Sequence, residues 1–123
     1  MGNRIYLVED SPKLRNLIQQ AIENIGAFQV VGSAACAATA IREIEELVPD
    51  IAIVDLELKK GSGWDVLDGT SAVRTRMILT NHNLSLFRAE AKRRGITHFF
   101  DKSLEFDLFL ETLRKLSVES DNN

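Results

Sequence analysis

Hydrophobic and polar positions follow two patterns that alternate along the chain. Short runs of apolar, β-branched residues, such as IAIV at 51–54, are typical of strands buried on both faces. Between these runs, apolar residues recur every three or four positions, which is typical of helices with one buried face. The pattern predicts strands over 4–8, 28–34, 51–54, 76–80 and 96–100, and helices over 12–25, 37–47, 64–72, 84–95 and 105–116.

The ends of the predicted helices carry residues that favour a helix start or stop. Ser11 is expected to be the N-cap of the first helix, Pro12 its first residue and Gly26 its stop. Pro49 is expected to end the second helix, and Ser103 to be the N-cap of the last one. The apolar faces of the first two helices are predicted to comprise Leu14, Leu17, Ile18, Ala21, Ile22 and Ile25, and Ala37, Ile41, Ile44 and Val48.

Strands that alternate with helices of these lengths predict a parallel sheet, because each crossover returns the chain to the same edge through a helix. The predicted fold class is α/β, a doubly wound five-stranded parallel sheet with helices on both faces. The third helix is expected to be short, because the connection between Asp55 and Thr80 is short. We expect one domain over residues 1–118 and a flexible C-terminal tail at 119–123.

The composition of the 123 residues narrows the classes of function. A formal net charge of −3 speaks against direct nucleic-acid binding, which needs a clustered positive surface. The single cysteine, Cys36, excludes an internal disulfide and a multi-cysteine zinc site, and it indicates a reducing compartment. Since no apolar stretch reaches the roughly 18 residues that span a bilayer, we expect a cytoplasmic protein with no membrane association.

Polar side chains stand where four of the predicted strands end. They are Glu9 and Asp10 after the first strand, Asp55 after the third, Thr80 in the fourth and Lys102 after the fifth. Because the carboxyl ends of parallel strands share one edge of the sheet, where ligands bind in open α/β folds, we expect these side chains to converge. Clustered carboxylates need a compensating cation, and Mg²⁺ suits a few carboxylates beside a phosphate. The sequence therefore predicts a Mg²⁺-dependent phosphoryl site.

Four short motifs at these strand ends resemble the receiver domains of two-component response regulators. They are VEDS after the first strand, IVDLEL after the third, ILTN after the fourth and FFDKS after the fifth, and they occur in order over residues 4–116. Each motif alone is weak, but the ordered set is specific. The resemblance implies a flavodoxin-like (βα)5 fold and a signalling switch that is phosphorylated rather than an enzyme that turns over a substrate.

The same resemblance implies a role for each acidic residue. Asp55 would accept a phosphoryl group from a sensor histidine kinase or a histidine phosphotransfer protein. Asp10, Asp55 and the backbone carbonyl of Glu57 would coordinate Mg²⁺, and Glu9 would reach the ion through water. These roles agree with the chemistry of phosphoryl transfer. A carboxylate nucleophile must be positioned in line with the bond that breaks, and the charge on the transferring group must be neutralised.

Further residues are implied to bind and to report the phosphoryl group. Lys102 would pair with its oxygens, and Thr80 would donate a hydrogen bond to one of them. Phe99 matches an aromatic position that changes rotamer on activation, although a plain core phenylalanine is an equal interpretation. A downstream protein target or a second copy of the chain would bind through the fourth helix, the fifth strand and the fifth helix.

Other features depart from the family or have ordinary explanations. Lys59 stands where the family often has proline, which predicts a more mobile loop after Asp55. Asn81 stands where the family often has a smaller residue, and its bulk predicts restricted access to the site. His82 and His98 are expected to be surface histidines. The basic residues at 88–94 are expected to form a solvated face with favourable charge at a helix C-terminus.

Two alternative functions compete with the receiver hypothesis. A small Mg²⁺-dependent phosphatase of the haloacid dehalogenase type also uses Asp, Thr and Lys, but its Asp-x-Asp-x-Thr signature and its cap segment are absent. The second alternative is a receiver-like module that binds partners without being phosphorylated. The complete set of acids, threonine and lysine argues against it.

Overall fold

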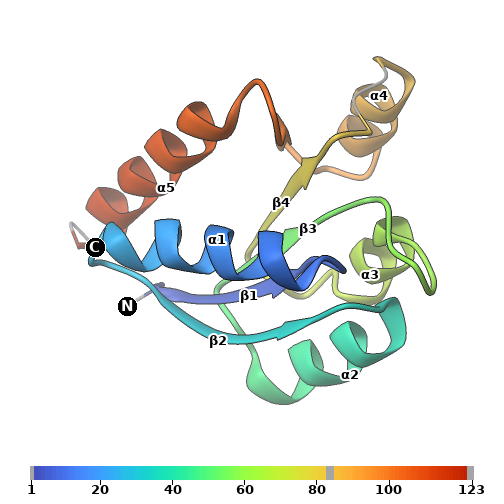
Figure 1. Cartoon of the computed structure of the whole chain (residues 1–123), viewed down its shortest axis with the longest axis horizontal. Helices are drawn as coiled ribbons and strands as arrows, with labels where there is room; N and C mark the ends of the chain where they lie inside the picture. Colours follow the sequence, from blue (N-terminus) through green and yellow to red (C-terminus); the bar gives the residue numbers. More distant parts are fainter. Residues whose placement is uncertain (1, 83–84, 122–123) are drawn as a thin grey trace.

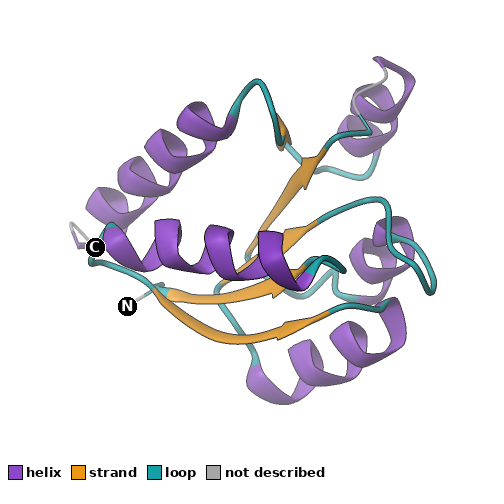
Figure 2. Ribbon diagram, viewed as in Figure 1, coloured by secondary structure: helices purple, strands orange, loops and turns teal. Residues whose placement is uncertain are grey.

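A computed structural model of the chain describes residues 2–82 and 85–121. It contains one parallel sheet with helices packed on both of its faces (Figures 1 and 2). The elements are β1 (Arg4–Val8), α1 (Pro12–Asn24), β2 (Gln29–Ala34), α2 (Ala37–Leu47), β3 (Ile51–Val54), α3 (Gly63–Gly69), β4 (Thr75–Thr80), α4 (Ser85–Arg93), β5 (His98–Asp101) and α5 (Phe106–Asp121).

The strand order confirms the doubly wound fold class. The sheet has five strands in the order β2-β1-β3-β4-β5, so the direction of winding reverses between β1 and β3. In open α/β sheets a ligand binds where this reversal opens a crevice at the carboxyl edge. Val8 is paired with Val54 and Thr80 with Asp101. The residues that follow these pairs therefore leave the sheet side by side.

Two hydrophobic clusters, one on each face, hold the helices to the sheet. On one face Ile18 and Ile22 of α1 pack with Phe109 and Leu113 of α5. On the other face lie the apolar residues of α2, α3 and α4. All four residues of β3 are buried, two toward each cluster, which explains why IAIV lacks alternation.

The start of α1 confirms the predicted cap, but its buried face is narrower than we expected. Ser11 Oγ accepts the N–H of Leu14 at 3.3 Å. Ile18 and Ile22 are buried, whereas Leu14 is 36% and Leu17 52% exposed. The prediction that these two leucines join the core was wrong, because α1 turns only Ile18 and Ile22 fully toward the sheet, while Leu14 lines a pocket at the acidic edge.

Val48 does not belong to the buried stripe of α2 that we predicted. The helix ends at Leu47, and Val48 adopts a left-handed conformation with φ of 48° and is 71% exposed. The following residue, Pro49, disfavours a right-handed helical conformation at Val48. The chain therefore turns one residue earlier than the hydrophobic pattern suggests.

The third helix is short, as expected, and is tied closely to β3. It spans Gly63–Gly69 and begins with a reciprocal cap between Ser62 and Asp65. A Cβ atom on Gly63 would lie 2.3 Å from the carbonyl oxygen of Asp55 and 2.6 Å from Cα of Leu56. Only glycine fits this contact, which brings the start of α3 directly against the end of β3.

The last helix starts later and ends later than we predicted. Ser103 is not its N-cap, because α5 begins at Phe106 and residues 102–104 form a turn. The helix continues to Asp121, so the first part of the expected flexible tail at 119–123 is helical, and residues 122–123 lie outside the described part. Residue 84, the expected first residue of the fourth helix, also lies outside it.

Among the described helices, none is both long and apolar enough to cross a membrane.

Candidate functional site

Asp55 leaves the end of β3 as a buried carboxylate with donors on both oxygens. Its backbone N–H donates to the carbonyl of Val8 at 3.0 Å, which continues the pairing of β1 with β3. Its Oδ1 accepts the hydroxyl of Thr80 at 2.7 Å and the N–H of Glu57 at 3.2 Å. Its Oδ2 accepts the ammonium of Lys102 at 2.9 Å. The carboxylate is thus held by Thr80 at the end of β4 and by Lys102 directly after β5.

Lys102 joins the two ends of the sequence at this edge. Its Nζ donates to Glu9 Oε1 at 2.5 Å as well as to Asp55, and its side chain is only 10% exposed. Burial alone lowers the pKa of the ammonium, but the hydrogen bonds to the two carboxylates outweigh it and raise the pKa. Lys102 therefore stays charged and compensates the buried acids.

Three carboxylates lie close enough to share a cation. One oxygen each from Glu9, Asp10 and Asp55 lies within 4.8 Å of the other two. Glu9 is almost fully buried and also accepts the N–H of Ser11, which ties it to the start of α1. The pocket in front of these acids has a volume of about 200 Å³ and is lined by Glu9, Asp10, Ser11, Leu14, Asp55, Glu57, Asn81 and Lys102. Its oxygen-only ligands suit a hard divalent cation.

The loop after β4 forms the far wall of this pocket. Thr80 is fully buried, and its hydroxyl accepts the N–H of His82 at 3.1 Å while donating to Asp55. Asn81 is exposed at the pocket, and its Oδ1 accepts the hydroxyl of Ser103 at 2.9 Å. The Ser103 side chain thus braces Asn81 rather than capping α5. The last two residues of the loop, 83–84, lie outside the described residues.

A side-chain contact that the sequence did not indicate joins Glu57, after β3, to the loop after β4. His82 Nδ1 lies 2.6 Å from Glu57 Oε2, although both side chains are largely exposed. The His82 ring stacks on Phe87 with a centroid distance of 5.4 Å, and Phe87 in turn meets Trp64 edge-on at 6.3 Å. The prediction of an ordinary surface histidine missed these contacts, because Glu57 and His82 come from different loops and share no sequence spacing.

Arg88 and Arg94 depart from the solvated basic face expected at 88–94, whereas Lys92 and Arg93 are exposed as expected. The guanidinium of Arg88 lies 4.6 Å above the ring of half-buried Phe99 and donates to the Phe99 carbonyl at 3.3 Å. It also pairs with Glu105 at 2.6 Å. Arg94 likewise pairs with Asp68 at 2.8 Å and lies over Trp64. Arg88 thus ties α4 to β5 and to the residue just before α5, and Arg94 ties the segment just after α4 to α3, because an arginine can stack and pair at the same time.

Comparison with known proteins decides the family. Residues 5–114 match the model of the response regulator receiver domain. The chain belongs to this family. The receiver domain is 30% identical over 122 residues to the nitrate/nitrite response regulator protein homolog of Haemophilus influenzae, covering 93% of this chain and 56% of that protein. It is 36% identical over 64 residues to protein-glutamate methylesterase/protein-glutamine glutaminase 2 of Koribacter versatilis, covering 52% of this chain and 18% of that protein.

Solved structures share the fold of this receiver domain over nearly its whole length. A two-component response regulator of the LuxR family from Aurantimonas superposes with a TM-score of 0.82 at 28% identity, covering 94% of this chain and 85% of that one. The response regulator domain of Thermotoga maritima CheB gives a TM-score of 0.81 at 23% identity, covering 98% and 97%. The chain spans 56% and 18% of the length of the two curated relatives named above.

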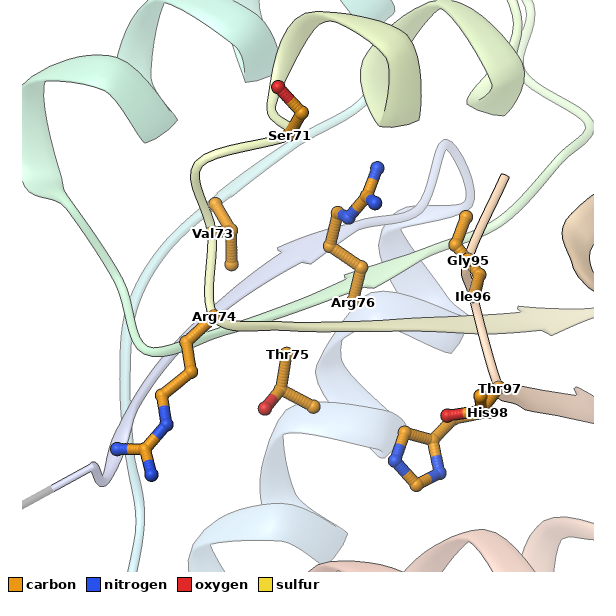
Figure 3. A pocket seen from close by; sticks show the side chains of 9 residues that line it. All are labelled: Ser71, Val73, Arg74, Thr75, Arg76, Gly95, Ile96, Thr97 and His98. Carbon is orange, nitrogen blue, oxygen red and sulfur yellow. The ribbon is translucent and has the colours of Figure 1, made fainter. Parts of the chain in front are cut away.

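A second polar pocket lies at the opposite edge of the receiver domain, near the starts of β4 and β5. It measures about 230 Å³ and is lined by Ser71, Val73, Arg74, Thr75, Arg76, Gly95, Ile96, Thr97 and His98 (Figure 3). Arg74 points away from the other labelled side chains. The guanidinium of Arg76 donates to the Leu67 carbonyl at 2.7 Å, so it holds the end of α3. The two arginines do not converge, and the acidic pocket remains the candidate site.

Proposed function

We propose that this receiver domain accepts a phosphoryl group on Asp55 from a sensor histidine kinase or a histidine phosphotransfer protein. The observation that carries the proposal is the environment of Asp55, whose carboxylate lies between the Thr80 hydroxyl, the Lys102 ammonium and the acids Glu9 and Asp10. Burying several carboxylates beside a single ammonium lowers the stability of the fold. Such arrangements are found mainly at functional sites, which supports a functional role for this cluster.

The residues on this edge divide the chemistry of transfer between them. An Asp55 oxygen attacks the phosphorus atom as the bond from phosphorus to the imidazole nitrogen of the donor breaks, and the electron pair stays on that nitrogen. Lys102 and Thr80, which now donate to Asp55, transfer their hydrogen bonds to oxygens of the phosphoryl group. Positioning and charge neutralisation of this kind account for most of the catalysis in phosphoryl transfer.

The acidic cluster fits Mg²⁺ as the cofactor. Asp10 and Asp55 would supply carboxylate oxygens as direct ligands, and Glu9 would reach the ion through water. We assign the backbone carbonyl of Glu57 as a further ligand on the strength of the family resemblance. When bound, Mg²⁺ would offset the negative charge of the acids and of the transferring group. Asp10 is the least buried of the three acids and is not held by Lys102, so it is free to serve as a direct ligand.

We assign the chain the role of a phosphoacceptor rather than of an enzyme with steady turnover. The family match supports this role and speaks against the haloacid dehalogenase alternative. The test is the intact mass of the protein after incubation with acetyl phosphate and Mg²⁺. We expect one labile phosphoryl group per chain, its loss in Asp55→Asn, and unchanged labelling in Asp107→Asn, which alters an exposed acid on α5. Steady hydrolysis of many phosphomonoesters would favour the phosphatase instead.

The partners and the location follow as further parts of the proposal. We assign the surface of α4, β5 and α5 to a downstream protein or to a second copy of the chain, because Phe99 and Arg88 meet there. The net charge of −3 favours a chain without direct nucleic-acid binding. The single cysteine and the family match support a location in the cytoplasm, and we propose no membrane association. A DNA-binding response regulator of the LuxR family from Staphylococcus aureus shares the fold at 22% identity, so nucleic-acid binding needs its own titration with duplex DNA.

A further inference from the structure

The side chains of Arg88 and Glu105 and the backbone of Asp101 form a continuous series of hydrogen bonds from α4 to the segment that carries Lys102. Arg88 of α4 donates from its guanidinium to Glu105 Oε1 at 2.6 Å. The same oxygen accepts the backbone N–H of Asp101 at 2.8 Å. Asp101 is the residue directly before Lys102. Two hydrogen bonds therefore connect α4 to the backbone of Asp101, the residue directly before Lys102.

Asp101 shapes the turn from which Lys102 reaches the site. Its Oδ1 accepts the N–H groups of Ser103 at 2.9 Å and Leu104 at 2.8 Å, and its carbonyl accepts the N–H of Glu105 at 2.9 Å. A short acidic side chain that binds backbone N–H groups two and three residues on fixes a turn. The N–H of Lys102 is held in turn by the Thr80 carbonyl at 2.9 Å. The direction in which Lys102 leaves the backbone is thus set by Asp101 and Thr80 together.

The outer part of this chain of contacts is accessible to a partner. The side chains of Arg88 and Glu105 are 38% and 31% exposed, whereas Asp101 is buried. The N–H of Asp101 and the guanidinium of Arg88 both lower the pKa of Glu105, so this carboxylate stays charged at neutral pH. A protein that bound α4 and drew Arg88 toward itself would remove one of the two groups that hold Glu105 in place.

We propose that Asp101 and the Arg88–Glu105 ion pair are positioning residues for Lys102, and that displacement of α4 therefore changes the rate of phosphoryl transfer to Asp55. The inference rests on the proposed function of the site. None of the three side chains lines the acidic pocket. Their effect must pass through Lys102, which distinguishes them from groups that touch the phosphoryl donor.

The first test measures the rate at which acetyl phosphate and Mg²⁺ label the protein. We expect Asp101→Ala to slow labelling about tenfold and Arg88→Ala about threefold, whereas Asp101→Asn, which keeps the Oδ1 acceptor, stays within about twofold of the parent. In a Lys102→Ala background the same changes should have almost no further effect, because residues that act as one unit are not additive. Arg93→Ala, which breaks an exposed pair with Glu90 on the same helix, is the matched control and should match the parent.

The second test does not depend on phosphorylation or on the Lys102 variant. Amide exchange measured by NMR should show faster exchange of the Lys102 N–H in Asp101→Ala and in Arg88→Ala, and no change in Arg93→Ala. Unchanged exchange would overturn the positioning role, as would Asp101→Asn labelling as slowly as Asp101→Ala, or full additivity with Lys102→Ala. A parent that accepts no phosphoryl group would instead contradict the proposed function, and amide exchange would still decide the positioning role.

Discussion

Lys102 and Glu9 form an ion pair with an Nζ–Oε1 distance of 2.5 Å, although they come from the two ends of the chain. Glu9 is only 2% exposed, so its charge is compensated inside the protein rather than by water. A buried charge that loses its partner is strongly destabilising, because it keeps its desolvation cost without the attraction. The ammonium therefore stabilises the acidic edge before any cation or phosphoryl group arrives.

Replacement of Lys102 by methionine is expected to lower the free energy of unfolding by about 3 kcal/mol at pH 7, the scale of a broken buried ion pair. The loss should shrink in acid, because protonation of Glu9 or Asp55 removes the uncompensated charge. Saturating Mg²⁺ should also restore part of it. Urea unfolding at several pH values, with and without Mg²⁺, measures this effect. A loss that is the same at pH 4 and pH 7 would show that packing, not charge, is responsible.

Asp10 should contribute to cation binding without contributing to the resting ion pairs. We expect Asp10→Asn to weaken Mg²⁺ binding about tenfold or more, equivalent to about 1.4 kcal/mol, and to abolish labelling of Asp55. Stability without Mg²⁺ should stay the same or rise, because one repelling carboxylate is gone. Titration calorimetry with Mg²⁺ provides the measurement, and Asp107→Asn serves as control. Equal affinity in Asp10→Asn and the parent would remove Asp10 from the ligand set.

Asn81 should slow reactions of the phosphoryl group with small molecules. Its side chain lines the pocket and is braced by the Ser103 hydroxyl at 2.9 Å. Replacement by alanine is expected to speed labelling by acetyl phosphate and hydrolysis of phosphorylated Asp55 by about threefold each. Ser103→Ala should give a smaller change in the same direction. Equal rates in Asn81→Ala and the parent would show that the bulk of the side chain is irrelevant.

Thr80 should couple the phosphoryl group to the surface of α4 and β5. Its hydroxyl now binds Asp55 Oδ1 at 2.7 Å, so a phosphoryl oxygen would compete for this donor and draw the loop after β4 inward. A ligand shifts an equilibrium only through a difference in affinity between its states. We therefore expect Thr80→Ala to accept beryllofluoride, a phosphoryl mimic, without the amide NMR shifts at 85–100 that the parent shows. Shifts of equal size in both proteins would contradict the coupling.

Glu105 gives the stability of the chain a pH dependence with a defined sign. Its folded-state pKa is lowered from the usual 4.5, chiefly by the Asp101 N–H and then by Arg88. A lowered pKa means that the stabilisation is fully present above the usual pKa and is lost as the pH falls through the lower folded-state pKa. Thermal unfolding of Glu105→Gln and the parent should therefore differ most at neutral pH and converge below pH 4. A constant difference across that range would exclude this charge as the cause.

The sequence was sufficient to predict which side chains meet at the carboxyl ends of the strands. A continuous apolar run such as IAIV has one good interpretation, and in a parallel sheet it carries Asp55 to the same edge as Lys102. Contacts between loops were not predictable. The contacts of His82 with Glu57 and of Arg88 with Glu105 depend on how α4 packs against its neighbours. The hydrophobic periodicity of the sequence predicts the helix but not this packing. Val48 shows the remaining error, since its hydrophobicity indicated burial while the following proline decided its backbone.

The full burial of β3 contrasts with the position of β5 at the edge of the sheet. Asp55 directly follows a strand that is paired on both sides and covered on both faces, and Gly63 packs against the Asp55 carbonyl. Such a strand has little freedom to move, because every shift disturbs close-packed neighbours on four sides. β5, by contrast, is an edge strand with one neighbour, and it carries both Phe99 and the turn before α5. We therefore expect phosphorylation to leave the backbone of Asp55 almost unmoved. The structural change should instead occur in β5 and the turn after it, where fewer packed neighbours must be displaced.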